Sequence, residues 1–212
     1  LLDLVGEPTD ELLETFISRV PMPLISRIAI ISPHGWFGQT NALGKPDTGG
    51  QVIYILDQVR ALETHLKDEL ALTGLDIEPK IIVLTRLIPE AQDTTCNQRL
   101  EKIFNTKNGW ILRVPFRDDQ YNVVKIWVSR FKIWPYLETF AEDAATELTG
   151  EFQGRPDLVI GNYSDGNLVA SMLSDKFDVI QCTIAHALEK NKYTLSDLNW
   201  QQLERDYNFS LQ

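Results

Sequence analysis

The stretch that decides the fold is residues 27–66, which read RIAIISPHGWFGQTNALGKPDTGGQVIYILDQVRALETHL. It begins with a β-branched run, Arg27 to Ile31, which predicts a buried strand. A loop rich in proline, glycine and amide side chains follows this strand. From Gly50 the apolar residues recur at helical spacing until Gly74, a residue type that commonly ends helices. A buried strand, a long loop and a long helix in this order are typical of the unit that α/β folds repeat.

The alternation of strand and helix signals continues along the rest of the sequence. Further strands are expected over residues 80–85, 111–116, 157–160 and 179–184, and further helices over residues 10–20, 129–148 and 167–174. Residues 86–108 are polar and irregular, the helix over 129–148 should end before Gly150, and residues 161–166 (GNYSDG) read as a polar loop. This order predicts an α/β fold: a Rossmann-like, mostly parallel sheet with helices on both faces. Loops after Ile31, Ile160 and Ile184 would then share the sheet edge where such folds bind ligands.

Composition narrows the choice of partners. The 212 residues carry a formal net charge of −10, with 43% hydrophobic and 24% charged residues, which is typical of an ordinary globular protein. The acidic balance argues against nucleic acid or an acidic membrane surface as a partner, because both bind through concentrated Lys and Arg. An anionic small molecule remains compatible with it, since a local glycine-rich site and a few cations can override the global charge.

Cysteine usage and the chain ends bear on location. Cys96 and Cys182 stand far apart and in no metal-ligand spacing, so we expect no disulfide framework and take the cytoplasm as the default location. No run approaches the ~18 apolar residues of a membrane-spanning segment, and no signal peptide precedes the first segment. Because the sequence starts at Leu1 in mid-pattern instead of at Met, we expect a piece of a longer polypeptide, whose missing ends would carry any targeting signal.

The most informative local motif is Thr48-Gly49-Gly50-Gln51 at the start of the long helix. A helix N-terminus offers unpaired backbone N–H groups and a positive dipole end, so it can hold a phosphate or diphosphate. Two glycines allow a ligand to approach the backbone without meeting a Cβ. The motif is neither a dinucleotide fingerprint nor a Walker A loop, and a plain turn is the alternative. The neighbouring loop with His34 favours the phosphate site.

Histidines support a pocket at the same sheet edge. His34 and His186 each follow an apolar strand, whereas His65 lies within the long helix and reads as a surface residue. Each of the first two could simply tie down its loop through hydrogen bonds, but two histidines beside a glycine-rich helix start favour a ligand pocket. No third ligand stands at a suggestive spacing, so we expect no metal site.

Two cationic positions could contribute to this pocket. Lys190 and Lys192 follow His186 closely and could hold a sugar hydroxyl and a negative charge, or form a solvated charged turn. Arg130 opposes the dipole of its predicted helix, which indicates either a ligand contact or an ion pair. No glycosidase carboxylate pair, Gly-x-Ser-x-Gly elbow or nucleophilic cysteine motif is present. If the protein is an enzyme, it would therefore act by positioning its substrates and by stabilising the charge of a leaving group.

Several segments together resemble the sucrose synthases: SPHG, LGKPDTGGQVIYILDQVRALE, TTCNQRLEKIF, ILRVPF, WPYLETFAEDAATEL, PDLVIGNYSDGNLVA and QCTIAHALEKNKY. The resemblance covers nearly the whole sequence and implies one half of a GT-B glycosyltransferase fold. Residues 25–212 would form the first, acceptor-side domain, still incomplete, and residues 1–24 a remnant of a preceding regulatory region or linker helix. The nucleotide-binding second domain would be missing. Trp36 stands where plant members usually carry tyrosine, which suggests a bacterial or cyanobacterial type.

The resemblance also implies an activity: reversible, retaining glucosyl transfer between sucrose and a nucleoside diphosphate, UDP or ADP. It implies no required cofactor or metal, a homotetramer, and a fragment that is inactive alone. The residues it assigns are Gly49, Gly50 and Gln51 for the diphosphate, His186 as the catalytic residue on the transferred glucose, and His34, Arg130 and Lys192 for fructose. Two alternatives stay open: a sucrose-phosphate synthase, and a sugar-binding or assembly module without catalysis.

Overall fold

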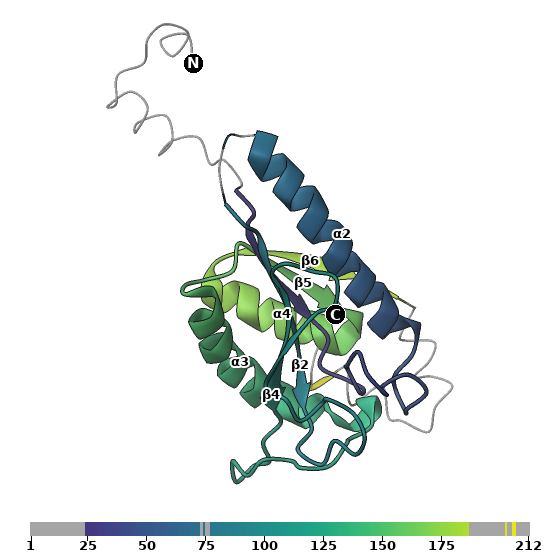
Figure 1. Cartoon of the computed structure of the whole chain (residues 1–212). Helices are drawn as coiled ribbons and strands as arrows, with labels where there is room; N and C mark the ends of the chain where they lie inside the picture. The colour runs from purple at the N-terminus through teal and green to yellow at the C-terminus, as the bar shows by residue number, and fades with distance from the viewer. Residues whose placement is uncertain (1–23, 73, 75–76, 187–201, 203–204, 207–212) are drawn as a thin grey trace, which may run out of the picture.

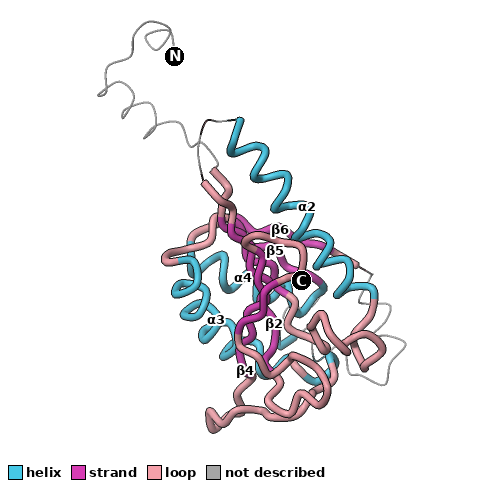
Figure 2. The backbone as a smooth tube through the Cα atoms, in the orientation of Figure 1, coloured by secondary structure: helices cyan, strands magenta, loops and turns pink. Residues whose placement is uncertain are grey.

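The computed structural model describes residues 24–72, 74, 77–186, 202 and 205–206. Within these residues, six strands form one sheet in the order β3-β4-β2-β1-β5-β6. Figures 1 and 2 show this sheet with helices on either side. The strands are β1 (Arg27–Ile31), β2 (Lys80–Leu87), β3 (Leu100–Lys102), β4 (Gly109–Pro115), β5 (Leu158–Asn162) and β6 (Ile180–Ile184). All neighbouring pairs are parallel except β3 and β4. The expected mostly parallel α/β sheet is therefore confirmed.

In the described part of the chain, three long helices cover this sheet on its two faces (Figure 1). They are α2 (Gly50–Leu72), α3 (Leu137–Phe152) and α4 (Tyr163–Phe177). α2 packs on one face, and α3 and α4 lie on the other. The helix expected over residues 10–20 lies outside the described residues. No described helix combines the length and the apolar character that crossing a membrane requires.

The alternation of side chains along β1 explains why both faces are covered. Ile28 and Ile30 point into the core under α2, whereas Ala29 and Ile31 point into the core under α3 and α4. All four residues are at most 1% exposed. Each fully buried isoleucine contributes about 1.5–3 kcal/mol relative to an exposed one. An apolar run without polar alternation is what a central parallel strand requires.

Several boundaries differ from the sequence-based expectations, among them that α4 spans Tyr163–Phe177 where residues 167–174 were expected and that β4 spans Gly109–Pro115 where residues 111–116 were expected. The segment 86–108 is not wholly irregular, because β2 extends to Leu87 and the short antiparallel β3 pairs with β4. The helix expected over 129–148 begins only at Leu137, after two short 3-10 turns, Arg130–Lys132 and Trp134–Tyr136. Gly150 does not end α3, which continues to Phe152 and closes at Gln153 in a left-handed conformation.

Residues 161–166 are not the polar loop that their composition suggests. Gly161 and Asn162 end β5, and α4 begins at Tyr163. A Cβ at Gly161 would lie 2.3 Å from Asn167 Oδ1, and a Cβ at Gly166 would lie 2.8 Å from the Ile31 carbonyl oxygen. These glycines therefore serve close packing of α4 against β5 and β1. Tyr163 makes the sharp turn itself, with φ of 58°.

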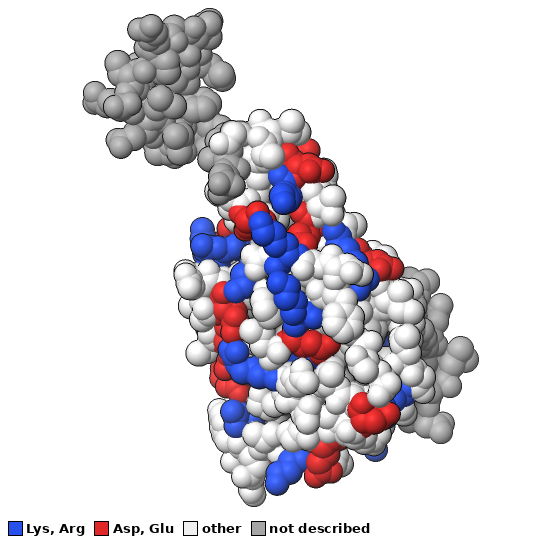
Figure 3. Space-filling view, viewed as in Figure 1, with Lys and Arg blue, Asp and Glu red and all other residues white. Residues whose placement is uncertain are grey.

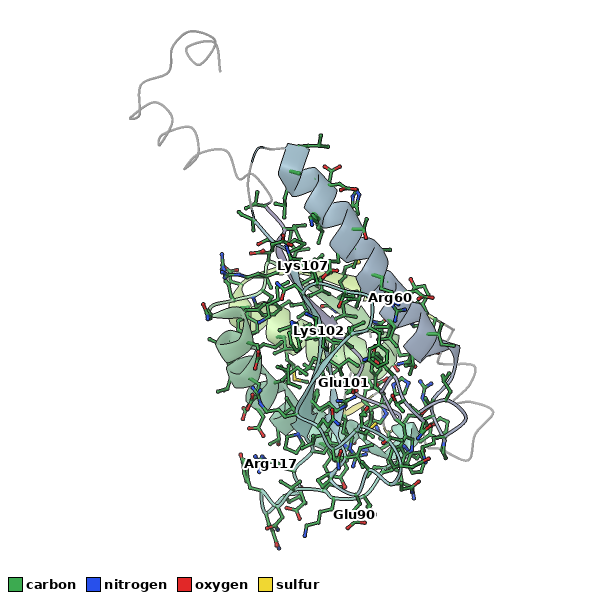
Figure 4. All side chains as sticks on the ribbon, viewed as in Figure 1. Arg60, Glu90, Glu101, Lys102, Lys107 and Arg117 are labelled. Atoms are coloured by element: carbon green, nitrogen blue, oxygen red, sulfur yellow. The ribbon has the colours of Figure 1, made fainter. Side chains whose placement is uncertain are left out.

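Lys and Arg gather in a stripe on one face of the molecule, flanked by Asp and Glu (Figure 3). Lys102 and Lys107, labelled on this face in Figure 4, are both engaged within the protein. The Lys102 ammonium lies 5.1 Å from the Trp110 ring and donates to the Lys107 carbonyl, and Lys107 pairs with Glu78. This pairing holds the pKa of the Glu78 carboxyl below its usual range. Contacts within the protein therefore account for both cations, and neither requires an anionic ligand from outside.

Candidate functional site

The candidate site lies where β1, β5 and β6 end. β1 has β2 on one side and β5 on the other, so the chain segments that leave β1 and β5 diverge at a topological switch point of the sheet. In parallel α/β sheets ligands bind at such a switch point. The residues that follow these three strands include His34, Tyr163 and His186, and the structure brings their rings together.

The loop between β1 and α2 is closed at its base by a tight backbone crossing. Gly35 has φ of 79°, and a Cβ there would come within 2.1 Å of the Asp47 carbonyl oxygen, so only glycine fits. Beside this crossing the Trp36 N–H donates to Thr48 Oγ1 over 3.0 Å. The two ends of the loop are therefore held together, and Gly49 and Gly50 follow directly from this anchored point.

The start of α2 is open. Gly49 and Gly50 are exposed, and an added Cβ at either would meet no heavy atom of the described residues within 4 Å. No acidic side chain stands in the first turn of α2, so none competes for the helix N-terminus. The first backbone N–H groups of a helix have no intrahelical partner and carry the positive end of the dipole. The arrangement can hold an anionic group close to the backbone.

His34 is buried in a chain of hydrogen bonds. Its Nδ1 lies 2.7 Å from Asp165 Oδ2, and both side chains are only 2% exposed. Its Nε2 lies 2.8 Å from Gln51 Oε1, and the Gln51 amide in turn donates to Ser32 Oγ over 2.5 Å. His34 thereby links α4 to the first turn of α2.

Tyr163 is the centre of the aromatic part of the site. Its ring stacks on His186 at 4.5 Å between ring centroids, and meets the edge of His34 at 5.1 Å. The Arg130 guanidinium lies 4.7 Å from the same ring, a distance suited to a cation–π contact. Three of the predicted site residues thus converge on one tyrosine.

Further contacts fix His186. Its Nε2 lies 2.8 Å from Asn162 Oδ1, and its ring meets the edge of Tyr54 at 5.2 Å. Tyr54 is on α2, four residues after Gly50, so the helix that offers the glycines also contacts this histidine. Lys192 lies outside the described residues.

Sequence reasoning missed four residues that complete the cluster: Tyr54, Asn162, Tyr163 and Asp165. Three of them belong to the segment NYSDG, which composition assigned to a loop. A polar segment at the end of a buried strand was the available signal. The strand-to-helix turn could not be read from it, because the turn uses a left-handed tyrosine in place of a glycine.

A second buried hydrogen-bond network holds the loop between β1 and α2 against the sheet. Glu101 on β3, labelled in Figure 4, pairs with Arg113 on β4 and accepts hydrogen bonds from Gln39 (2.8 Å) and Thr95 (2.7 Å). Arg113, 1% exposed, also donates twice to the Phe37 carbonyl. Burial alone would raise the pKa of Glu101, but the hydrogen bonds and the guanidinium together hold it below its usual range. The middle of the loop is therefore tied to the sheet.

Metal ligands and the buried cysteine are further candidates for chemistry among the described residues. No group of three or more His, Cys, Asp or Glu side chains in this part of the chain could hold a metal ion. Burial raises the pKa of the Cys96 thiol, which disfavours the reactive thiolate. What the described residues provide is an open helix start, a buried polar chain and an aromatic wall with two histidines and an arginine.

The sheet order and the helices on both faces define the class as a Rossmann-like α/β domain, and the two comparisons that follow identify it as a domain of the GT-B type. A solved sucrose-phosphate synthase from Thermosynechococcus elongatus shares this fold, with a TM-score of 0.55 and 21% identity over 82% of this chain and 36% of that one. A family model described as the sucrose synthase first GT-B domain matches residues 11–212. The chain therefore belongs to the sucrose synthase first GT-B domain family.

Relatives agree with this assignment. The chain is 61% identical to a sucrose synthase of Thermosynechococcus vestitus, over 99% of this chain and 26% of the relative. It is 64% identical to a sucrose synthase of Melioribacter roseus, over 100% of this chain and 27% of the relative. The chain thus spans about a quarter of the length of the curated relatives it matches.

Proposed function

We propose that residues 25–212 are the acceptor-side half of a sucrose synthase-type glucosyltransferase, and that residues 1–24 belong to a preceding regulatory region or linker. The complete protein would transfer glucose reversibly between sucrose and UDP or ADP, with retention at the anomeric carbon. A second GT-B domain elsewhere in the polypeptide would bind the nucleotide. The observation that carries the proposal is the open start of α2 beside the cluster of His34, Tyr163 and His186.

In this scheme Gly49 and Gly50 receive the diphosphate on backbone N–H groups, with Gln51 beside them. Negative charge collects on the departing diphosphate as its bond to glucose breaks. A helix N-terminus aimed at that charge stabilises the transition state more than the ground state, and this difference accelerates the reaction. The hydrogen bond between Gln51 and His34 supports the proposal, because it fixes the residue beside the glycines.

The sugars would lie on the aromatic side of the site. His186 would contact the transferred glucose, and its bond to Asn162 sets the orientation of its ring. Arg130, His34 and Lys192 would line the fructose pocket. Of these, His34 is only 3% exposed, so it would offer little surface to the sugar. A phosphate oxygen of the departing diphosphate would take the proton of the fructose hydroxyl, so the scheme requires no carboxylate base and no metal.

The alternatives differ in the acceptor. A sucrose-phosphate synthase would use fructose 6-phosphate, and a sugar-binding or assembly module would bind without turnover. Identities of 61% and 64% to proteins named sucrose synthase, against 21% to a sucrose-phosphate synthase, favour fructose. We further propose a homo-oligomer for the complete protein, which light scattering would test.

A comparison of the two acceptors in separate reactions tests the proposal. The complete protein is incubated with UDP-glucose and either fructose or fructose 6-phosphate, and the disaccharide product is quantified. We expect product from fructose at a rate at least about tenfold higher, since a site fitted to one substrate discriminates strongly. A preference for the phosphate ester would favour the sucrose-phosphate synthase reading. Calorimetric binding of UDP and fructose without any product would favour the non-catalytic module.

A further inference from the structure

Asp47 stands at the crossing point of the loop that joins β1 to α2. Its backbone φ is 53°, in the left-handed region that residues other than glycine rarely adopt. Its carbonyl oxygen is the atom that a Cβ on Gly35 would strike. Strained backbone persists only where the surrounding structure fixes it, and such strain clusters at functional sites. The conformation of Asp47 therefore calls for a reason.

The side chain of Asp47 supplies that reason. Its Oδ2 accepts a hydrogen bond of 2.8 Å from the backbone N–H of Arg130, 83 residues further along the chain. Arg130 opens a short 3-10 turn whose own N-cap residue, Ser129, makes no side-chain capping bond. Asp47 thus fills the role of a capping residue from a distant segment. Its carboxylate fixes where this turn sits relative to the loop.

Arg130 is held both at its backbone and at its side chain. Its backbone is bound by Asp47, and its guanidinium lies 4.7 Å from the Tyr163 ring. Asp47 is also only two residues before Gly49. One carboxylate therefore determines the separation between the glycines at the start of α2 and the arginine on the aromatic side of the site.

We propose that Asp47 is a positioning residue for Arg130 and so sets the affinity for the sugar acceptor. This inference rests on the proposed function, in which Arg130 lines the acceptor pocket. Loss of the carboxylate frees the turn that carries Arg130. It leaves the start of α2 in place, because Val52, Ile55 and Val59 anchor that helix in the core. The effect therefore falls on the acceptor and spares the nucleotide sugar.

Two substitutions in the complete protein separate the carboxylate from the backbone conformation. Asp47→Gly removes the acceptor oxygen but suits the left-handed backbone, and Asp47→Asn keeps both an acceptor oxygen and tolerance for that backbone. We expect Asp47→Gly to raise the KM for fructose about tenfold, as a lost hydrogen bond to a charged group does. The kcat and the KM for UDP-glucose should stay within about twofold, and Asp47→Asn should restore all three values.

Hydrogen exchange gives a readout that does not depend on turnover. The amide of Arg130 should exchange about tenfold or more faster in Asp47→Gly than in the unmodified protein, and at the original rate in Asp47→Asn. Asp118 provides the matched control, because its carboxylate also accepts backbone N–H bonds, from Gln120 and Asn122, in an exposed turn. Asp118→Gly should leave the kinetics and the Arg130 amide unchanged.

The results that overturn the inference are specific. An unchanged fructose KM in Asp47→Gly, or an equally protected Arg130 amide, would remove the positioning role. A parallel rise in both KM values would assign Asp47 to general loop folding, and failure of Asp47→Asn to restore the fructose KM would do the same. If the complete protein transferred no glucose to fructose, the proposed function would fail. The exchange rates of the Arg130 amide in the two variants would then still support or contradict the hold of Asp47 on the turn.

Discussion

At the scale of single residues, Gly50 and Gly150 form a natural comparison. Both lie in helices, neither has a positive φ, and an added Cβ at either would meet no heavy atom within 4 Å. They differ in place, since Gly50 starts α2 at the candidate site and Gly150 lies near the end of α3. Because both positions have open space, a larger side chain is compatible with the fold at each. A comparison of the same substitution at the two positions therefore separates an effect on ligand binding from an effect on folding.

Gly50→Val in the complete protein should lower kcat/KM for glucosyl transfer by about 100-fold or more, because isopropyl carbons would occupy the space of the phosphates. Thermal denaturation should show a melting temperature near that of the unmodified protein. Gly150→Val is the control and should retain full activity. Wild-type turnover in Gly50→Val would show that the diphosphate does not meet this helix start.

His186 can be tested against His65 in the same way. His186 stacks on Tyr163 and is bonded to Asn162, whereas His65 is exposed on α2. We expect His186→Ala to reduce kcat about 100-fold, the usual loss for a group that contacts the reacting sugar. His65→Ala should have no effect. Equal rates in the two variants, measured under saturating substrates, would return His186 to a structural role.

At the scale of elements, the ion pair of Glu101 and Arg113 joins β3 and β4 and holds the β1–α2 loop beneath the site. Glu101→Gln keeps the shape of the side chain but leaves the charge of Arg113 without its carboxylate. Removing one partner of a buried pair costs about 3–5 kcal/mol, which urea denaturation at neutral pH would measure. The exposed Glu142 supplies the control, and Glu142→Gln should change the stability by less than about 0.5 kcal/mol. An equally small loss in Glu101→Gln would show that the pair does not stabilise the loop.

The same pair predicts a pH dependence. The pKa of Glu101 is lower in the folded protein than its usual value, so the folded state binds this proton less readily than the unfolded state. The stability from this group is present above the unfolded pKa of about 4.3 and is lost as the pH falls through the lowered folded value. Denaturation curves between neutral pH and about pH 3 should therefore converge for the unmodified protein and Glu101→Gln. A stability difference that stays constant over this range would contradict the prediction.

Elements also show what the sequence could and could not predict. The central strands β1, β2 and β5 were readable because buried parallel strands are continuous apolar runs. β3 was not, since three residues carry no periodic signal and its pairing with β4 is a tertiary contact. The start of α3 was misplaced because Pro135 is compatible with both a 3-10 turn and the first turn of an α-helix.

The residues of the candidate site also divide into those that the sequence predicted and those that it did not. His34 and His186 were predicted to share one edge of the sheet, and the resemblance assigned Arg130 and Gln51 to the same site. The structure brings the four residues together around Tyr163 and Asp165. Tyr163 and Asp165 were not predicted, because their roles depend on a left-handed turn and on burial that no local pattern encodes. The chemical role of each residue stays a prediction, since geometry alone does not identify the ligand.

At the scale of the whole molecule, the proposed function makes the candidate site one wall of a crevice whose other wall is a second domain. Gly49 and Gly50 are exposed at the start of α2, beside the cluster of His34, Tyr163 and His186, and the chain spans about a quarter of the length of its relatives. Transition-state stabilisation by preorganised dipoles requires a water-excluded site, which one open wall does not enclose. The isolated chain should therefore bind substrates weakly and transfer no glucose.

Calorimetric titration and a product assay on matched samples test this expectation. The complete protein should bind UDP at least about 100-fold more tightly than the 212-residue chain, because the nucleotide would lose most of its contacts in the half-site. Circular dichroism of the chain should first show the helices of the fold, so that weak binding cannot be ascribed to unfolding. Sucrose formation from UDP-glucose and fructose should appear only with the complete protein. Turnover by the chain alone, abolished by Gly50→Val, would mean that the second wall is dispensable and that this domain carries the entire catalytic apparatus.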